Sequence, residues 1–167
     1  MEKPIAKVHV KRNGEKGLSY TAAWGRIKAS QVCGFYLEAI TLEESIISDR
    51  LISHLTGVGE KSIQCESDMR ESLSSLIIRL ERSLNHGKSE VNDKNLVNRL
   101  NSWREKRNCA VHGMVKSIPG TKTEKVDDFL EKAKECAKEG EKIARDVCNW
   151  QRKEFRKSKC NSIERKK

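Results

Sequence analysis

The chain has 167 residues, of which 35% are charged and only 5% aromatic, and its formal net charge is +10. This length fits one domain with a real core, and the composition favours a charged helical bundle over a sheet protein. No apolar run approaches the roughly 20 residues that a membrane-spanning helix needs, so we expect no membrane partner.

The positive charge is concentrated at both ends of the chain. Residues 1–30 have a net charge of +5 and residues 142–167 one of +7, which leaves −2 for the segment between them. Basic ends favour a polyanion such as nucleic acid as the partner. A solubilising tail without a partner is the alternative that charge alone leaves open.

The six cysteines form no CxxC pair, which argues against a zinc site. The N-terminus is polar and basic rather than a secretory signal. We therefore predict reduced thiols in a cytoplasmic protein, with Cys33, Cys109 and Cys136 at core positions that need a small residue. We expect no metal ion and no other cofactor.

The N-terminal segment alternates apolar and polar residues between Ile5 and Val10, and Asn13-Gly14 is a turn signal. The pattern predicts either a short strand or β-hairpin or a basic arm. We assign residues 1–28 to this arm or hairpin.

Four stretches with apolar residues at steps of three and four predict long helices. They run from about 29 to 55, from 67 or 68 to 84, from 93 to 112, and from 121 into the basic residues near 155. Capping-box spacing marks the second at Asp68 and Glu71 and the fourth at Thr121 and Glu124. Short connections predict an all-α fold, an up-and-down four-helix bundle. We place this bundle at residues 29–157, followed by a basic tail at 158–167.

Two of these helices have a charged residue where the pattern requires an apolar one, namely Glu44 and Arg107. An unpaired ion in a core is costly, so opposite charges on two inward faces predict an ion pair. Glu43 is the alternative partner if the register differs by one residue. An arginine that snorkels from the edge of its helix is the purely structural interpretation. An apolar pair of similar volume often stabilises a core equally well, so stability alone does not explain an ion pair here. The ion pair therefore suggests that Glu44 holds the guanidinium of Arg107 for a ligand.

Arg107 begins the segment RNCAVH, which ends at His112 late in the third predicted helix. Asn108 and His112 are four residues apart and therefore share a helix face. His112 is the best acid–base group because an unperturbed imidazole titrates near pH ~6.5. The guanidinium of Arg107 matches phosphate oxygens. Three basic residues are expected to surround the site: Arg104, Lys106 and Lys116.

The segment RNCAVH resembles the arginine–polar–x3–histidine motif of the HEPN superfamily, helical-bundle ribonucleases of toxin–antitoxin and antiphage defence systems. The resemblance covers about residues 30–155. It implies that Arg107 and His112 are the catalytic pair and that Asn108 orients or contacts the substrate. It also implies a homodimer whose two motifs share one cleft, with an antitoxin or a larger defence complex as a further partner. One type of member has a modifiable tyrosine two residues after the histidine, where this chain has Met114.

We therefore predict a metal-independent endoribonuclease, a hydrolase that cleaves RNA through attack by the 2′-hydroxyl. A single histidine does not easily serve both as the base for the 2′-hydroxyl and as the acid for the leaving 5′-oxygen. A dimer resolves this because each chain supplies its own His112 and Arg107. Five residues besides the catalytic pair are assigned to substrate binding or orientation: Asn108, Glu44, Arg104, Lys106 and Lys116. Two alternatives stay open, namely a non-catalytic module that binds RNA or a nucleotide, and a protein-interaction bundle without a nucleic-acid role.

Overall fold

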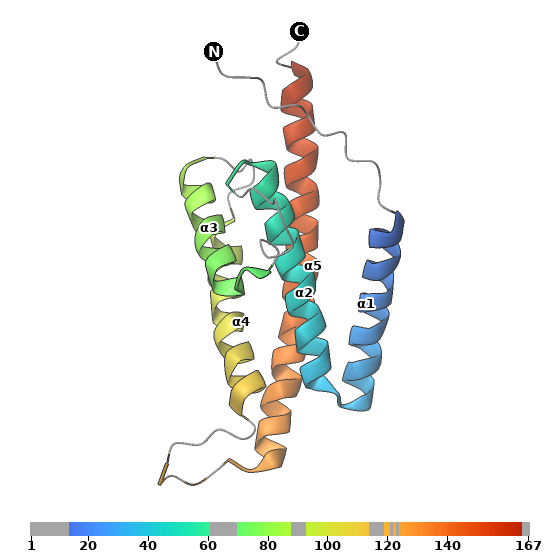
Figure 1. Cartoon of the computed structure of the whole chain (residues 1–167), viewed down its shortest axis with the longest axis vertical. Helices are drawn as coiled ribbons and strands as arrows, with labels where there is room; N and C mark the ends of the chain where they lie inside the picture. The colour runs from blue at the N-terminus through green and yellow to red at the C-terminus, as the bar shows by residue number, and fades with distance from the viewer. Residues whose placement is uncertain are drawn as a thin grey trace.

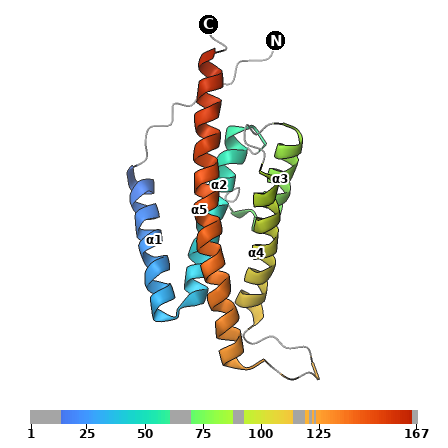
Figure 2. The same cartoon turned by 180° about the vertical axis from the view of Figure 1, so that it is seen from behind.

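A computed structural model describes residues 14–60, 70–87, 93–113, 119–120, 122 and 124–164. This part of the chain forms five helices and no strand: α1 (Gly14–Cys33), α2 (Tyr36–Gly57), α3 (Leu73–Asn85), α4 (Lys94–Gly113) and α5 (Val126–Glu164). The central pair α2 and α5 has α1 on one side and α3 and α4 on the other (Figure 1; Figure 2). The all-α prediction is confirmed, with five helices in place of four. No helix in these ranges combines the length and apolar character that crossing a membrane requires.

The helix α1 occupies a segment that the sequence assigned to an arm or hairpin. The hairpin prediction is wrong for residues 14–28, and the predicted boundary at residue 28 falls inside a helix. The first strand of the predicted hairpin lies outside the described residues. Tyr20, Trp24 and Ile27 follow helical spacing and pack on or within the core, so the period along this segment is helical.

Gly34 separates α1 from α2, which the sequence predicted as one helix from residue 29 to 55. Its φ is +79°, and the backbone N–H of Phe35 donates a hydrogen bond to the carbonyl of Ser30 at 2.8 Å. This is a Schellman arrangement, in which a glycine in the left-handed region ends a helix. The break escaped prediction because helical spacing continues on both sides of the glycine.

The helix α3 begins later than predicted because Ser72 caps it. The Ser72 hydroxyl accepts a hydrogen bond from the backbone N–H of Ser75 at 3.2 Å. Asp68, the predicted cap, lies outside the described residues. Glu71 precedes the helix instead of lying in its first turn, and it forms an ion pair with Arg79 at 2.7 Å.

The helix α4 agrees closely with the predicted helix at 93–112. It begins at Lys94, and the Asp93 carboxylate accepts a hydrogen bond from the backbone N–H of Leu96 at 2.9 Å. That bond satisfies one of the amide groups that a helix start leaves without a partner. The position of the RNCAVH segment late in a helix is therefore confirmed.

The helix α5 differs from the prediction at both ends. It begins at Val126, so Glu124 lies before the helix rather than in its first turn, and Thr121 is outside the described residues. At the other end it continues to Glu164, through most of the segment 158–167 that the sequence assigned to a tail. No helix-breaking residue interrupts this stretch, so the backbone continues the helix.

The central helices approach closely at Gly140 of α5. A Cβ at this position would lie 2.1 Å from Oε2 of Glu43 and 2.8 Å from Cζ2 and Nε1 of Trp103. Trp103 of α4 is fully buried, and its indole N–H donates to the carbonyl of Cys136 at 3.0 Å. Three helices therefore meet at a point where any side chain on α5 would collide.

Glu43 is a carboxyl group enclosed in this core. It is 0% exposed. Its Oε1 accepts a hydrogen bond from Nε2 of Gln31 at 3.3 Å, whereas Oε2 has no partner among the described residues. Burial raises the pKa of Glu43 to about 8. The carboxyl therefore keeps its proton near neutral pH, because the charged form would be poorly solvated.

We expect Gly140→Ala to lower the free energy of unfolding by about 1–3 kcal/mol, because the added methyl forces buried neighbours apart. Urea denaturation of parent and variant measures this difference. Gly25→Ala is the matched control, since a Cβ there meets nothing within 4 Å and alanine favours a helix. Equal stability of Gly140→Ala and the parent would contradict the described packing.

The buried Glu43 carboxyl makes stability depend on pH. Its folded pKa of about 8 lies above the ordinary 4.5, so the folded chain binds a proton that the unfolded chain releases. The free energy of unfolding should therefore fall between these values by about 1.4 kcal/mol per pH unit and level off above them. Glu43→Gln should remove this decline.

The measurement is the difference in unfolding free energy between parent and Glu43→Gln at several pH values across this window. Glu81→Gln, at an exposed position of α3, is the control for loss of a carboxylate. A parent-minus-variant difference that stays constant with pH would show that Glu43 does not titrate in this window.

Candidate functional site

Arg107 lies near the end of α4, and two side chains hold its guanidinium. Nη2 pairs with the carboxylate of Glu44 on α2, and Nη1 donates to Oδ1 of Asn108 at 2.7 Å. The Arg107 side chain is 23% exposed and that of Glu44 19%. The structure thus contains the ion pair predicted from the two apolar stripes, with Glu44 and not Glu43 as the partner.

His112 leaves α4 on a different side from Arg107. Five residues along an α-helix correspond to a rotation of about 140° and a rise of about 7.5 Å. Asn108 and His112, four residues apart, are both exposed and lie on nearly the same face. Asn108 therefore lies between the two predicted catalytic residues. Its Oδ1 accepts a hydrogen bond from Arg107, and it lies on the same face of α4 as His112.

A cavity of about 810 Å³ lies between the second half of α4 and the first part of α5. Asn108, Cys109 and His112 line it from α4, and Phe129 and Cys136 line it from α5. Arg107 is not among its lining residues. Within one chain the structure thus brings Asn108 and His112 to one cavity and leaves Arg107 beside it.

Two of the other basic residues predicted around the site make contacts within the chain. Arg104 points to α3, where its Nη1 donates to the hydroxyl of Ser74 at 2.7 Å. Lys106 pairs with Glu139 of α5 at 2.6 Å, and this hydrogen bond raises the lysine pKa. Lys116 lies outside the described residues. Arg104 and Lys106 therefore serve the packing of α4 against its neighbours as well as the local charge.

The cavity wall also carries carboxylates that sequence reasoning missed. The residues are Glu105, Glu124, Glu135 and Glu139. Three of them form an ion pair with a basic residue, whereas Glu135 forms none with a described residue. The spacing of Glu135 and Glu139 shows that they share a face of α5. The spacing does not show that this face borders His112, because the position of the face depends on how α5 packs against α4.

The described cysteines are free thiols, but only some occupy the core. Cys136 is buried, and burial raises its pKa to about 12. Cys33 and Cys109 are exposed, so their predicted core positions are wrong. Cys33 is the last residue of α1, and Cys109 lies on the face of α4 away from Trp103.

The described ranges contain no group of three or more His, Cys, Asp or Glu side chains that could hold a metal ion. The described residues on the cavity wall present one exposed imidazole, one amide, two thiols and several carboxylates and lysines.

We expect Glu44→Gln to lower the free energy of unfolding by about 1–2 kcal/mol, between the values for exposed and buried ion pairs. Urea denaturation tests this, with Glu38→Gln as the control on the same helix. Glu38 is 48% exposed and lies 3.9 Å from its arginine partner, so its loss should have little effect. A Glu44 variant as stable as the Glu38 variant would show that the Arg107 pair contributes nothing measurable.

Comparison with known proteins adds no relative from which a function can be transferred. No protein-family model matches the chain, and no curated protein or solved structure shows significant similarity to it. The ribonuclease function that the resemblance of RNCAVH implies therefore stays a prediction.

Proposed function

We propose that the protein is a metal-independent endoribonuclease in which His112 transfers the protons. The observation that carries this proposal is the arrangement of four side chains, three from the end of α4 and one from α2. Glu44 holds the guanidinium of Arg107, and Arg107 donates to Asn108. Asn108 in turn shares an open cavity with the exposed His112. An amide fixed beside a solvent-accessible imidazole is a useful arrangement for orienting a substrate and moving a proton.

RNA supplies its own nucleophile, so the protein needs to orient the 2′-hydroxyl, move protons and stabilise charge on the phosphoryl oxygens. His112 takes the proton of the 2′-hydroxyl or donates one to the leaving 5′-oxygen. Because Oδ1 of Asn108 faces Arg107, its Nδ2 is directed elsewhere and can donate to the substrate. The products are a 2′,3′-cyclic phosphate and a 5′-hydroxyl.

A homodimer belongs to this proposal for two reasons. Among the described residues, one chain supplies a single histidine to the cavity, and its own Arg107 does not line that cavity. Two copies that face each other provide two histidines, one as base and one as acid, and bring further guanidinium groups to the cleft. The toxin or defence role and an antitoxin partner are proposed from the motif resemblance alone. A cytoplasmic location is proposed from the pattern of the cysteines.

One observation favours a second function, a non-catalytic RNA-binding module. Glu135 lines the cavity and forms no ion pair with a described residue, and Glu44 already neutralises Arg107. A phosphate that enters the cavity is repelled by such a carboxylate. In this alternative RNA binds to another surface, and His112 takes part in no reaction.

We expect His112→Ala to reduce RNA cleavage in EDTA at least about 100-fold, because removal of a general acid–base group costs about that much. Arg107→Ala should reduce it as well, through loss of the group that fixes Asn108. The measurement is cleavage of labelled total RNA by purified protein, with end-group analysis of the fragments.

His86→Ala is the matched control, because His86 is an exposed histidine at the end of α3, away from the cavity. Circular dichroism establishes that each variant is folded. If the His112 and His86 variants cut RNA equally fast, or if the parent cuts no RNA beside an active reference nuclease, the non-catalytic function replaces the proposed one.

A further inference from the structure

A second cavity, of about 360 Å³, lies where α1, α2 and α5 meet. We call it the α1–α5 groove; the lining residues used below are Tyr20, Trp24, Arg50, Arg145, Asn149 and Arg152. No carboxylate is among its described lining residues. In Figure 2, α5 lies between α1 and α4, so the groove and the cavity of His112 are on different sides of α5.

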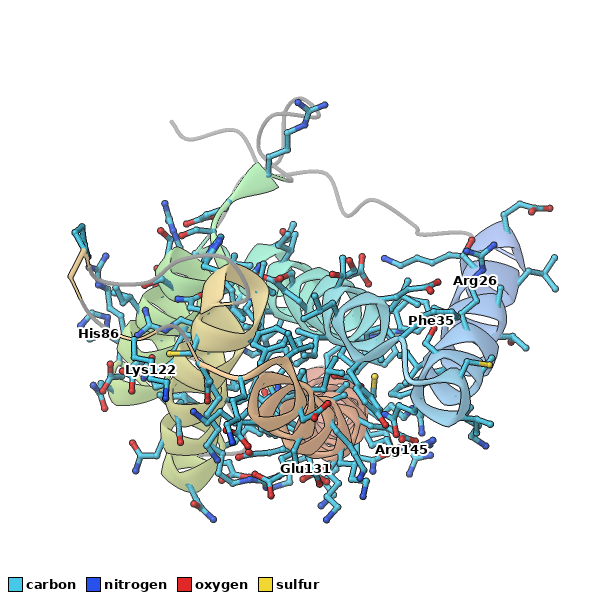
Figure 3. The ribbon with its side chains drawn as sticks, turned by 90° about the horizontal axis from the view of Figure 1, so that it is seen from below. Arg26, Phe35, His86, Lys122, Glu131 and Arg145 are labelled. Atoms are coloured by element: carbon cyan, nitrogen blue, oxygen red, sulfur yellow. The ribbon has the colours of Figure 1, made fainter. Side chains whose placement is uncertain are left out.

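Aromatic rings and guanidinium groups are paired in this groove. The guanidinium carbon of Arg50 lies 4.0 Å from the centre of the Tyr20 ring, and that of Arg145 lies 4.6 Å from the centre of the Trp24 ring. Arg145 projects from α5 on the side of α1, away from His86 and Lys122 (Figure 3). Rings and guanidinium planes next to each other are the surfaces on which the bases of single-stranded nucleic acid stack.

Two of the three arginines have no carboxylate partner among the described residues. Nε of Arg50 is buried without a hydrogen bond, and its Nη1 donates to Gln151 at 3.2 Å. Arg152 has only a 3.4 Å contact with Asn149. Arg145 differs, because it pairs with Glu141 at 2.6 Å. Guanidinium groups with donors to spare bind phosphate oxygens well.

The acid nearest in sequence to Arg50 does not neutralise it. Asp49 accepts a hydrogen bond from Nζ of Lys16 at 2.7 Å and one from the Tyr20 hydroxyl at 2.5 Å. These contacts orient the Tyr20 ring under Arg50 and occupy the carboxylate. The charge of Arg50 therefore stays available to a ligand in the groove.

The basic surface continues from the groove along α5. Arg145, Arg152 and Arg156 are separated by seven and four residues, so they follow one face of the helix over about 16 Å. Arg156 is exposed, and α5 extends beyond the other helices at this end (Figure 1). A strand whose base stacks in the groove therefore meets further cations along its backbone.

We infer that the α1–α5 groove binds single-stranded RNA, with a base stacked at Trp24 and the adjoining phosphates on Arg152 and Arg156. The biological role of the groove rests on the proposed ribonuclease function, in which RNA is the substrate. The groove then holds this RNA on the side of α5 opposite to the cavity of His112. Binding itself involves neither His112 nor Arg107.

The experiment measures binding of a labelled single-stranded 2′-O-methyl RNA of about ten nucleotides to the full chain by fluorescence anisotropy. The methyl group removes the nucleophile, so binding is observed without cleavage. Arg152→Ala combined with Arg156→Ala should weaken binding roughly 25-fold at about 0.1 M salt. Each phosphate contact contributes about 0.7 to the salt slope, so the loss of two contacts changes the affinity by about 10 to the power 1.4 over the tenfold range below about 1 M salt. The slope itself should fall by about 1.4.

The control variant combines Arg82→Ala with Lys122→Ala, which removes the same charge from exposed positions outside the groove. A second readout is specific to the groove. RNA should quench tryptophan fluorescence of the parent but not of Trp24→Phe, since Trp103 and Trp150 are only 0% and 4% exposed.

Equal weakening in the two double variants, or quenching that survives in Trp24→Phe, overturns the inference. Circular dichroism establishes that the variants are folded. The two proposals fail separately: groove binding without His112-dependent cleavage removes the ribonuclease only, and cleavage without groove binding removes the groove only.

Discussion

The close approach of α2 and α5 at Gly140 determines where the other functional elements lie. Because α5 has no side chain at this point, Glu43 of α2 and Trp103 of α4 both reach the same small volume. Glu44 follows Glu43 and is rotated by about 100° on α2, while Arg107 lies one turn beyond Trp103 on α4. The same crossing that buries Glu43 therefore brings Glu44 to Arg107. The ion pair that holds Arg107 beside Asn108 thus depends on a glycine in the core.

Sequence reasoning succeeded where the spacing of residues along a helix contains the information. The helical period located α4, and charges on two apolar stripes predicted the Glu44–Arg107 pair. It failed at Gly34, where a left-handed glycine ended a helix without disturbing the spacing on either side. It also could not show that Glu135 faces the cavity of His112. That depends on how α5 is rotated against α4, and no spacing within either helix contains this information.

The helix α5 separates two surfaces of different chemistry. Towards α4, it borders a cavity lined by an imidazole, an amide, two lysines and several carboxylates. Towards α1, it carries arginines next to aromatic rings. In the proposed functions, the first surface performs proton transfer and the second holds the polyanion. The arginines next to aromatic rings lie on the side of α5 away from the histidine, where they favour phosphate binding.

The burial of Glu43 also has a consequence for how the chain folds. The contact between Glu43 and Gly140 joins positions far apart in the sequence, whereas α1 and α2 form a local hairpin around Gly34. Contacts with large sequence separation are costly in loop-closure entropy, so docking of α5 on α2 is expected late in folding. Until then the carboxyl faces water and is ionised at neutral pH. Completion of the core is therefore coupled to the uptake of a proton from solvent.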